Sequence, residues 1–128
     1  MFELGNNYTR KEIAAKLGGS PIEYLPRAGG KVVCACLQAE LNPDAPKIIL
    51  PGFGPQIEAS AEALCEQPRD PIPVFIKQHV NAWKHVGDFV VERFSTHPKE
   101  IKEQEARSGR TGDKGISRVI YLKEAQKK

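Results

Sequence analysis

The sequence predicts one small α+β domain, with two or three short helices around a small curled sheet or a partly closed β-barrel. A length of 128 residues suits a single domain. Short apolar stretches rich in β-branched residues are separated by turns that contain many of the 11 glycines and 10 prolines. Helical patterns are few and scattered, which argues against a repeating βαβ unit. Sheets of this size without regular helical crossovers often curl into barrels.

The first element is a helix within residues 8–17. Thr9 and Glu12 have the spacing of a capping box, and Ile13 and Leu17 share one face. Gly18-Gly19 ends the helix. Residues 20–26 contain two prolines and cannot form a recognition helix, so a helix-turn-helix motif is excluded.

Strands and two more helices follow. Residues 22–25 and 31–37 are expected to form a hairpin around Gly29-Gly30, and the second strand, apolar on both faces, is expected to be central. The remaining expected elements are a strand at 47–50, a helix at 55–66, strands at 74–77 and 89–94, a helix at 98–106, an exposed loop at 108–113 and a strand at 116–122. Residues 1–122 thus form the domain, and residues 123–128 a basic, frayed tail.

Charge is unevenly distributed along the chain. The formal net charge is +3, but residues 107–128 hold seven basic and two acidic side chains, so the rest of the chain is slightly acidic. Such clustering suits a polyanionic partner, because phosphate neutralisation releases counterions. A solvated tail would give the same pattern.

Several function classes are disfavoured. No apolar run approaches the length of a membrane span, and three cysteines cannot form a disulfide framework, so a cytoplasmic protein without membrane association is expected. Cys34 and Cys36 would share one face of a strand, but no second cysteine pair completes a zinc site. We expect buried free thiols, no metal and no cofactor.

No catalytic group stands out, so an enzyme is not expected. The turn at residues 52–55 lacks the third glycine of a dinucleotide-binding loop. It leaves a helix N-terminus that can accept an anion, or a plain tight turn without a ligand. A small enzyme that acts on a nucleotide or phosphorylated substrate is therefore a minor alternative.

Two segments carry residues suited to nucleic acid. Trp83, the single tryptophan, lies close to Asn81 and Lys84, and such a group can stack on a base and bind its edge, although a core anchor is the alternative. Arg107, Ser108 and Arg110 occupy a glycine-containing loop that suits phosphate contact or is merely mobile.

Two short motifs resemble a known family. The start of the chain reads Gly5-x-x-Tyr8-x-Arg10-x-x-Ile13 and then Gly18-Gly19-Ser20. It resembles SRA-like domains attached to HNH nucleases in modification-dependent restriction systems. The pattern Trp83-x-x-Val86-Gly87-x-Phe89-x-Val91 resembles a strand of PUA-like barrels, the superfamily that contains SRA domains.

The resemblance implies a reader of modified DNA that flips a modified cytosine into an aromatic-lined pocket, and it implies a separate nuclease subunit as a further partner. Within that hypothesis, residue chemistry assigns Tyr24 and Trp83 to stacking and Asn81 to the base edge. The same reasoning assigns the phosphate contacts to basic and hydroxyl side chains, namely Arg10, Lys77, Lys84, Arg107, Ser108 and Arg110. The alternative is a protein-interaction or regulatory module that binds no nucleic acid.

Overall fold

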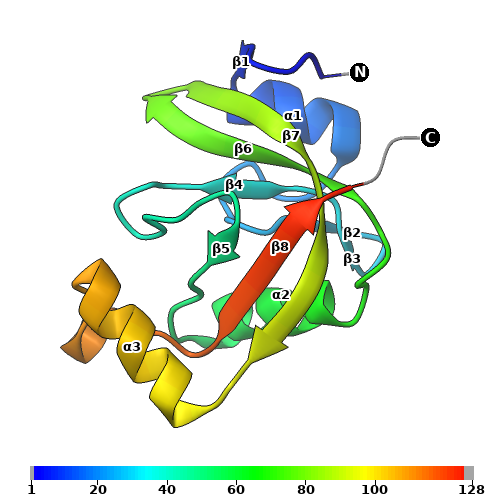
Figure 1. Ribbon diagram of the computed structural model, residues 1–128. Coiled ribbons are helices and arrows are strands. Elements are labelled where there is room, and N and C mark those ends of the chain that lie inside the picture. Colours follow the sequence, from blue (N-terminus) through cyan, green and yellow to red (C-terminus); the bar gives the residue numbers. More distant parts are fainter. Residues whose placement is uncertain (1, 126–128) are drawn as a thin grey trace.

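The computed structural model describes residues 2–125 and shows a curled sheet with three α-helices around it (Figure 1). The helices are α1 (Arg10–Leu17), α2 (Pro55–Cys65), α3 (Pro98–Ser108) and the short 3₁₀-helix η1 (Gly112–Lys114). The strands are β1 (Asn7–Tyr8), β2 (Arg27–Ala28), β3 (Lys31–Val32), β4 (Ala35–Leu37), β5 (Ile48–Ile49), β6 (Ile72–His79), β7 (Ala82–Ser95) and β8 (Val119–Glu124).

The main sheet has six strands in the order β4-β6-β7-β8-β5, with β1 paired to β7 beside that path. β4 pairs with β6 in parallel, and the other pairs are antiparallel. Register shifts in β6 and β7 mark irregularities of the kind that bend strands. Because β4 and β5 lie at opposite ends of the strand order, the sheet is curled but is not a closed barrel (Figure 1). The predicted α+β class is confirmed.

The three predicted helices are confirmed, because local signals define their ends. In α1, Thr9 accepts a hydrogen bond from the Glu12 backbone N–H, and the Glu12 side chain accepts one from the Thr9 N–H. Pro55 begins α2, where its missing N–H costs nothing. His97 caps α3, and Gly109 ends it in the left-handed conformation.

The predicted hairpin at residues 22–37 is wrong in its strands and right in its turn. Residues 22–25 are irregular, and β2 instead pairs with β3 around Gly29-Gly30. The expected strand at 31–37 is split into β3 and β4, and β4 is an edge strand of the main sheet rather than a central one. All three residues of β4 are nevertheless buried, and the segment before β2 covers the edge of the strand: the Cys36 N–H donates to the Tyr24 carbonyl.

The strand expected at 89–94 is the second half of β7, which also includes residues 82–88. β7 pairs with β6 to form a hairpin whose tip is Val80-Asn81. β8 continues through Lys123 and Glu124, which pair with β7, so the expected frayed tail does not begin at residue 123. Residues 126–128 lie outside the described residues.

Two apolar clusters hold α1 and α2 against the main sheet. The larger one fills the space between the sheet and α2 and includes Leu37, Leu64 and Val74. The second joins α1 to the β6–β7 hairpin and includes Ile13, Phe75 and Trp83. Within residues 2–125, no helix combines the length and the apolar character needed to cross a bilayer.

Candidate nucleic-acid interface

A pocket of about 320 Å³ lies beside the tip of the β6–β7 hairpin. We call it the hairpin pocket. Five of the residues selected from the sequence line it, from three separate segments: Arg10, Tyr24, Lys77, Asn81 and Trp83. None of the described residues that line it is acidic. The fold therefore gathers aromatic, amide and cationic side chains in one concave place.

Lys77 and Trp83 lie opposite each other in the β6–β7 register. The Lys77 ammonium is 5.8 Å from the centre of the indole ring, within the range of a cation–π contact. Trp83 is only 7% exposed and packs in the second apolar cluster. Of the two alternatives for Trp83, a core anchor and a stacking platform, its burial supports the core anchor, and the ring also forms a wall of the pocket.

Arg10 reaches the pocket from the first turn of α1. Its guanidinium lies 5.2 Å from the Trp83 ring, and its Nη2 donates to the carbonyls of Ser20 (3.1 Å) and Glu23 (2.6 Å). Its Nε is buried without a hydrogen-bond partner. Arg10 thus holds the 20–23 segment against α1 while it contributes positive charge to the pocket.

Tyr24 and Asn81 supply the neutral polar groups. The Tyr24 hydroxyl donates to the Ile57 carbonyl at 2.7 Å, and burial raises the pKa of this phenol well above its usual range. Tyr24 is therefore a fixed, neutral side chain. Asn81 is exposed at the hairpin tip with φ of 60°, a left-handed conformation that asparagine tolerates better than most residues.

Three further predicted residues lie outside the hairpin pocket. Lys84 is exposed and does not line it, because neighbours along a strand point to opposite faces. Arg107 and Ser108 lie at the end of α3, which is separated from the hairpin tip (Figure 1). Arg107 is bound by Asp44 through two hydrogen bonds of 2.8 and 3.2 Å, which hold the pKa of that carboxyl below its usual range.

Arg110 corrects the prediction of an exposed phosphate-binding loop at 108–113. Its side chain is buried, and its guanidinium donates to the carbonyls of Leu41, Leu50, Lys114 and Gly115. Burial lowers the pKa of this guanidinium. Its N–H groups point into the protein, so they are not available to a phosphate. Arg110 instead connects the segments before and after β5 to the segment before β8.

The anion site expected at the start of α2 is also occupied by the protein itself. The Gly54 N–H donates to a carboxylate oxygen of Glu58 at 2.9 Å. A carboxylate in the first turn of a helix satisfies a donor that would otherwise bind an external anion. One N–H group of the turn at residues 52–55 is therefore already paired within the protein.

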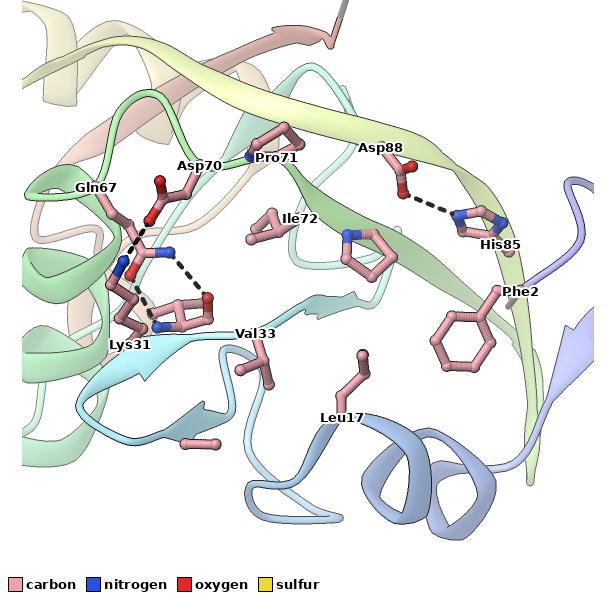
Figure 2. Close-up of a pocket in the computed structure, with 13 residues that line it drawn as sticks. Phe2, Leu17, Lys31, Val33, Gln67, Asp70, Pro71, Ile72, His85 and Asp88 are labelled. Atoms are coloured by element: carbon pink, nitrogen blue, oxygen red, sulfur yellow. Dashed lines mark hydrogen bonds and ion pairs between the residues drawn. The ribbon is translucent and has the colours of Figure 1, made fainter. Parts of the chain in front are cut away.

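A second pocket, of about 470 Å³, lies between the end of α1, the β2–β3 hairpin and the start of β6 (Figure 2). Its polar groups are mostly paired with one another: Lys31 with Asp70 at 3.0 Å, and the Gln67 amide with the Val32 backbone at 2.9 Å. At the other end of this pocket, the His85 Nε2 atom lies 3.5 Å from the Asp88 Oδ1 atom. Its lining holds two carboxylates and one lysine, so it is a less favourable place for a phosphate than the hairpin pocket, whose charged lining residues are both cationic.

Sequence reasoning missed other residues of the hairpin pocket. Cys36 contributes a thiol from β4, and Ile22 and Val80 are strongly exposed apolar side chains in its lining. The sequence did indicate an exposed position for Val80, because an apolar residue that precedes the asparagine of a hairpin turn lies too far from the core to be buried. Nothing local indicated Cys36, whose position depends on the parallel pairing of β4 with β6.

Comparisons with known proteins agree with this architecture. The family model described as "Domain of unknown function (DUF6697)" matches residues 7–127. The fold is similar to that in the crystal structure of an SUVH5 SRA domain in complex with hemi-methylated CG DNA. The TM-score is 0.64 at 14% sequence identity, over 96% of this chain and 88% of the other. No curated protein matches the sequence.

Proposed function

Because this chain belongs to the family described as "Domain of unknown function (DUF6697)" and has the fold of an SRA domain, we propose that it is a DNA-binding domain that reads a modified base. The hairpin pocket is the site of that reading. Modified cytosine is the base that the resemblance implies. The link to a separate nuclease subunit and to restriction stays a prediction.

The convergence on the hairpin pocket is the observation that carries this proposal. Its polar and aromatic side chains come from α1, from the segment before β2 and from the β6–β7 hairpin, and they surround one hollow. A base needs a flat apolar wall, a hydrogen-bonding group at its edge and positive charge near its phosphate. We assign the flat wall to Trp83 and Tyr24, the edge contact to Asn81 and the positive charge to Lys77.

The charges around the pocket support the same proposal. Arg10 and Lys77 are the charged residues of its lining, and both are cationic. A cationic mouth raises the local concentration of a polyanion and speeds its association. Extracting a base from the duplex costs a few kcal/mol, which stacking and hydrogen bonds in the pocket offset.

The exposed apolar side chains beside the pocket fit this role and also favour a second candidate function. Ile22 is 85% exposed and Val80 is 81% exposed, and apolar side chains in such positions can wedge between base steps. Exposed apolar groups of this kind also occur in surfaces that bind proteins. A protein-interaction module is therefore the function to test if DNA does not bind at about 50 mM salt, where non-specific contacts are strongest.

We expect Lys77→Ala to weaken DNA binding, measured by fluorescence polarisation of labelled duplexes across a salt series. Loss of one phosphate contact lowers the slope of log affinity against log salt by about 0.9. Lys99→Ala is the matched control, because Lys99 is exposed at the start of α3, away from the hairpin. Equal losses of DNA affinity in Lys77→Ala and Lys99→Ala would contradict a DNA-binding site at the hairpin.

We expect Asn81→Gly to reduce the preference between a duplex with modified cytosine and the plain duplex of the same sequence. Glycine keeps the left-handed turn, so the substitution removes the amide without straining the backbone. One lost base contact corresponds to about 1–3 kcal/mol of discrimination. Gln78→Gly, on the exposed part of β6, is the control. An unchanged preference in Asn81→Gly would remove the role of the amide.

A further inference from the structure

The Cys34 and Cys36 thiols lie side by side beneath the hairpin pocket. Their Sγ atoms are 4.0 Å apart, and both residues are almost fully buried. The residue between them, Ala35, begins β4, so the two side chains point to the same side. The third cysteine, Cys65, lies at the end of α2, where the Arg118 guanidinium donates to its sulfur at 3.6 Å.

Only one of the paired thiols faces the hairpin pocket. Cys36 is part of the lining, and Cys34 is not. Cys34 is 0% exposed and Cys36 is 2% exposed, so the pocket is the route by which a small solute reaches Cys36. The pair therefore has an outer thiol and an inner thiol.

The surroundings separate the two thiols chemically. The contact between the two sulfurs and the Arg10 guanidinium lower the pKa of Cys36, which lines the pocket, whereas the same contact and burial raise the pKa of Cys34. Arg10 also has a buried Nε that lacks an acceptor. A nearby Cys36 thiolate would supply negative charge for this group. The thiolate is the reactive form of cysteine.

We propose that Cys34 and Cys36 are a thiol oxidation site, in which Cys36 reacts with a hydroperoxide that enters the hairpin pocket and Cys34 then closes a disulfide. The Cys36 thiolate attacks one peroxide oxygen and the O–O bond breaks, which gives Cys36 sulfenic acid and releases hydroxide, or alcohol from an organic peroxide. The Cys34 sulfur then attacks the Cys36 sulfur, and water leaves with the thiol proton. Two thiols are oxidised, and one peroxide is reduced.

Closure of the disulfide changes the pocket. The two sulfurs must approach from 4.0 Å to about 2.05 Å, and Cys36 loses the negative charge that faces Arg10. Arg10 also holds the 20–23 segment beside the pocket. A shift of the Arg10 side chain after disulfide formation therefore moves this segment at the opening of the hairpin pocket. Regulation of DNA binding by this route rests on the proposed function, whereas the thiol chemistry does not.

The test of the chemistry uses the whole chain without DNA. After exposure to hydrogen peroxide, free thiols are blocked and the protein is digested with trypsin. Cleavage after Lys31 and Lys47 leaves Cys34 and Cys36 in one peptide, and Cys65 falls in the next peptide, which ends at Arg69. We expect the 32–47 peptide to lose two hydrogens while Cys65 stays free. Oxidation of Cys65 first, or at the same rate, would overturn the proposal.

Single variants separate the two roles. Cys34→Ser should stop at Cys36 sulfenic acid, which a dimedone probe captures, and Cys36→Ser should slow thiol loss at residue 34 at least ten-fold. Cys65→Ser is the control and should leave the rate unchanged. Far-UV circular dichroism checks each fold. If either serine variant unfolds, the peptide mapping of the unaltered chain still decides, because it needs no substitution.

The effect on DNA is measured separately. Oxidised protein, and the same sample after treatment with dithiothreitol, are titrated with the duplexes used above. We expect at least a three-fold difference in affinity that the reductant reverses. If the disulfide forms but the affinity for DNA is unchanged, the proposed oxidation site is supported and its regulation of DNA binding is contradicted. If neither form binds DNA, the proposed function fails while the peptide result still judges the thiol site.

Discussion

Arg110→Met is expected to lower the free energy of unfolding by about 3–5 kcal/mol, because four backbone carbonyls lose their donor and each buried acceptor left unsatisfied costs about 1–3 kcal/mol. Methionine keeps much of the side-chain volume but leaves the carbonyls of Leu41 and Leu50, and two more before β8, without their donors. Each buried acceptor left unsatisfied adds a desolvation cost. Urea denaturation followed by circular dichroism measures the loss as a shift in the midpoint.

Arg107→Met is the matched control for this experiment. Arg107 is exposed, and its pairing with Asp44 is a surface ion pair of the kind that contributes about 0.2–1 kcal/mol. A small loss of stability for Arg107 and a large one for Arg110 would establish that two arginines three residues apart have different roles. Equal, small losses would show that the Arg110 carbonyl contacts do not hold the structure together.

The contrast between these arginines shows where sequence reasoning reaches its limit. The pattern around Arg110 is polar and rich in glycine, and such a pattern predicts an exposed loop. Arg110 is buried because carbonyls near residues 41 and 50, distant in sequence, are brought against it. A gathering of free carbonyls around one guanidinium leaves no trace in the local sequence of either segment.

The same distinction explains the secondary structure. The helices were predicted because capping residues and turn glycines act within a few positions, as Thr9 does in α1. Strand limits were predicted less well, because pairing partners determine them. Residues 82–88 join β7 since β1 and β6 lie on either side of them. Residues 22–25 have strand-like composition but form no ladder.

The candidate site contains features that residue type predicted and features that only the fold determines. The chemistry of Tyr24, Asn81 and Lys77 was readable from residue type, and the fold places these side chains around one pocket. The meeting of these side chains at one pocket could not be predicted from the sequence. It depends on the register of the β6–β7 hairpin and on the loop that Arg10 fixes against α1. Arg107 carried the same chemical signal and lies elsewhere, held by Asp44.

Trp83→Ala is expected to cost about 3–5 kcal/mol of unfolding free energy, the usual result of removing a large buried aromatic ring. Trp83 belongs to the second apolar cluster, as Phe75 does, and only 7% of its surface is exposed. Total stabilities of small domains are about 5–15 kcal/mol, so this variant can be largely unfolded. A loss of DNA binding in Trp83→Ala would therefore report folding rather than recognition.

Trp83→Phe separates the two roles, because it keeps an aromatic ring in the cluster and should cost no more than about 1–3 kcal/mol, within the range of ordinary substitutions. If the indole is a wall of the DNA site, this folded variant binds DNA more weakly in the polarisation assay. In the unaltered chain the single tryptophan also serves as a probe: its fluorescence should change on titration with DNA, and Lys77→Ala should require more DNA for the same change. A folded Trp83→Phe with undiminished affinity, together with indole emission that DNA leaves unchanged, would place the ring in the core alone and move the recognition surface away from the hairpin pocket.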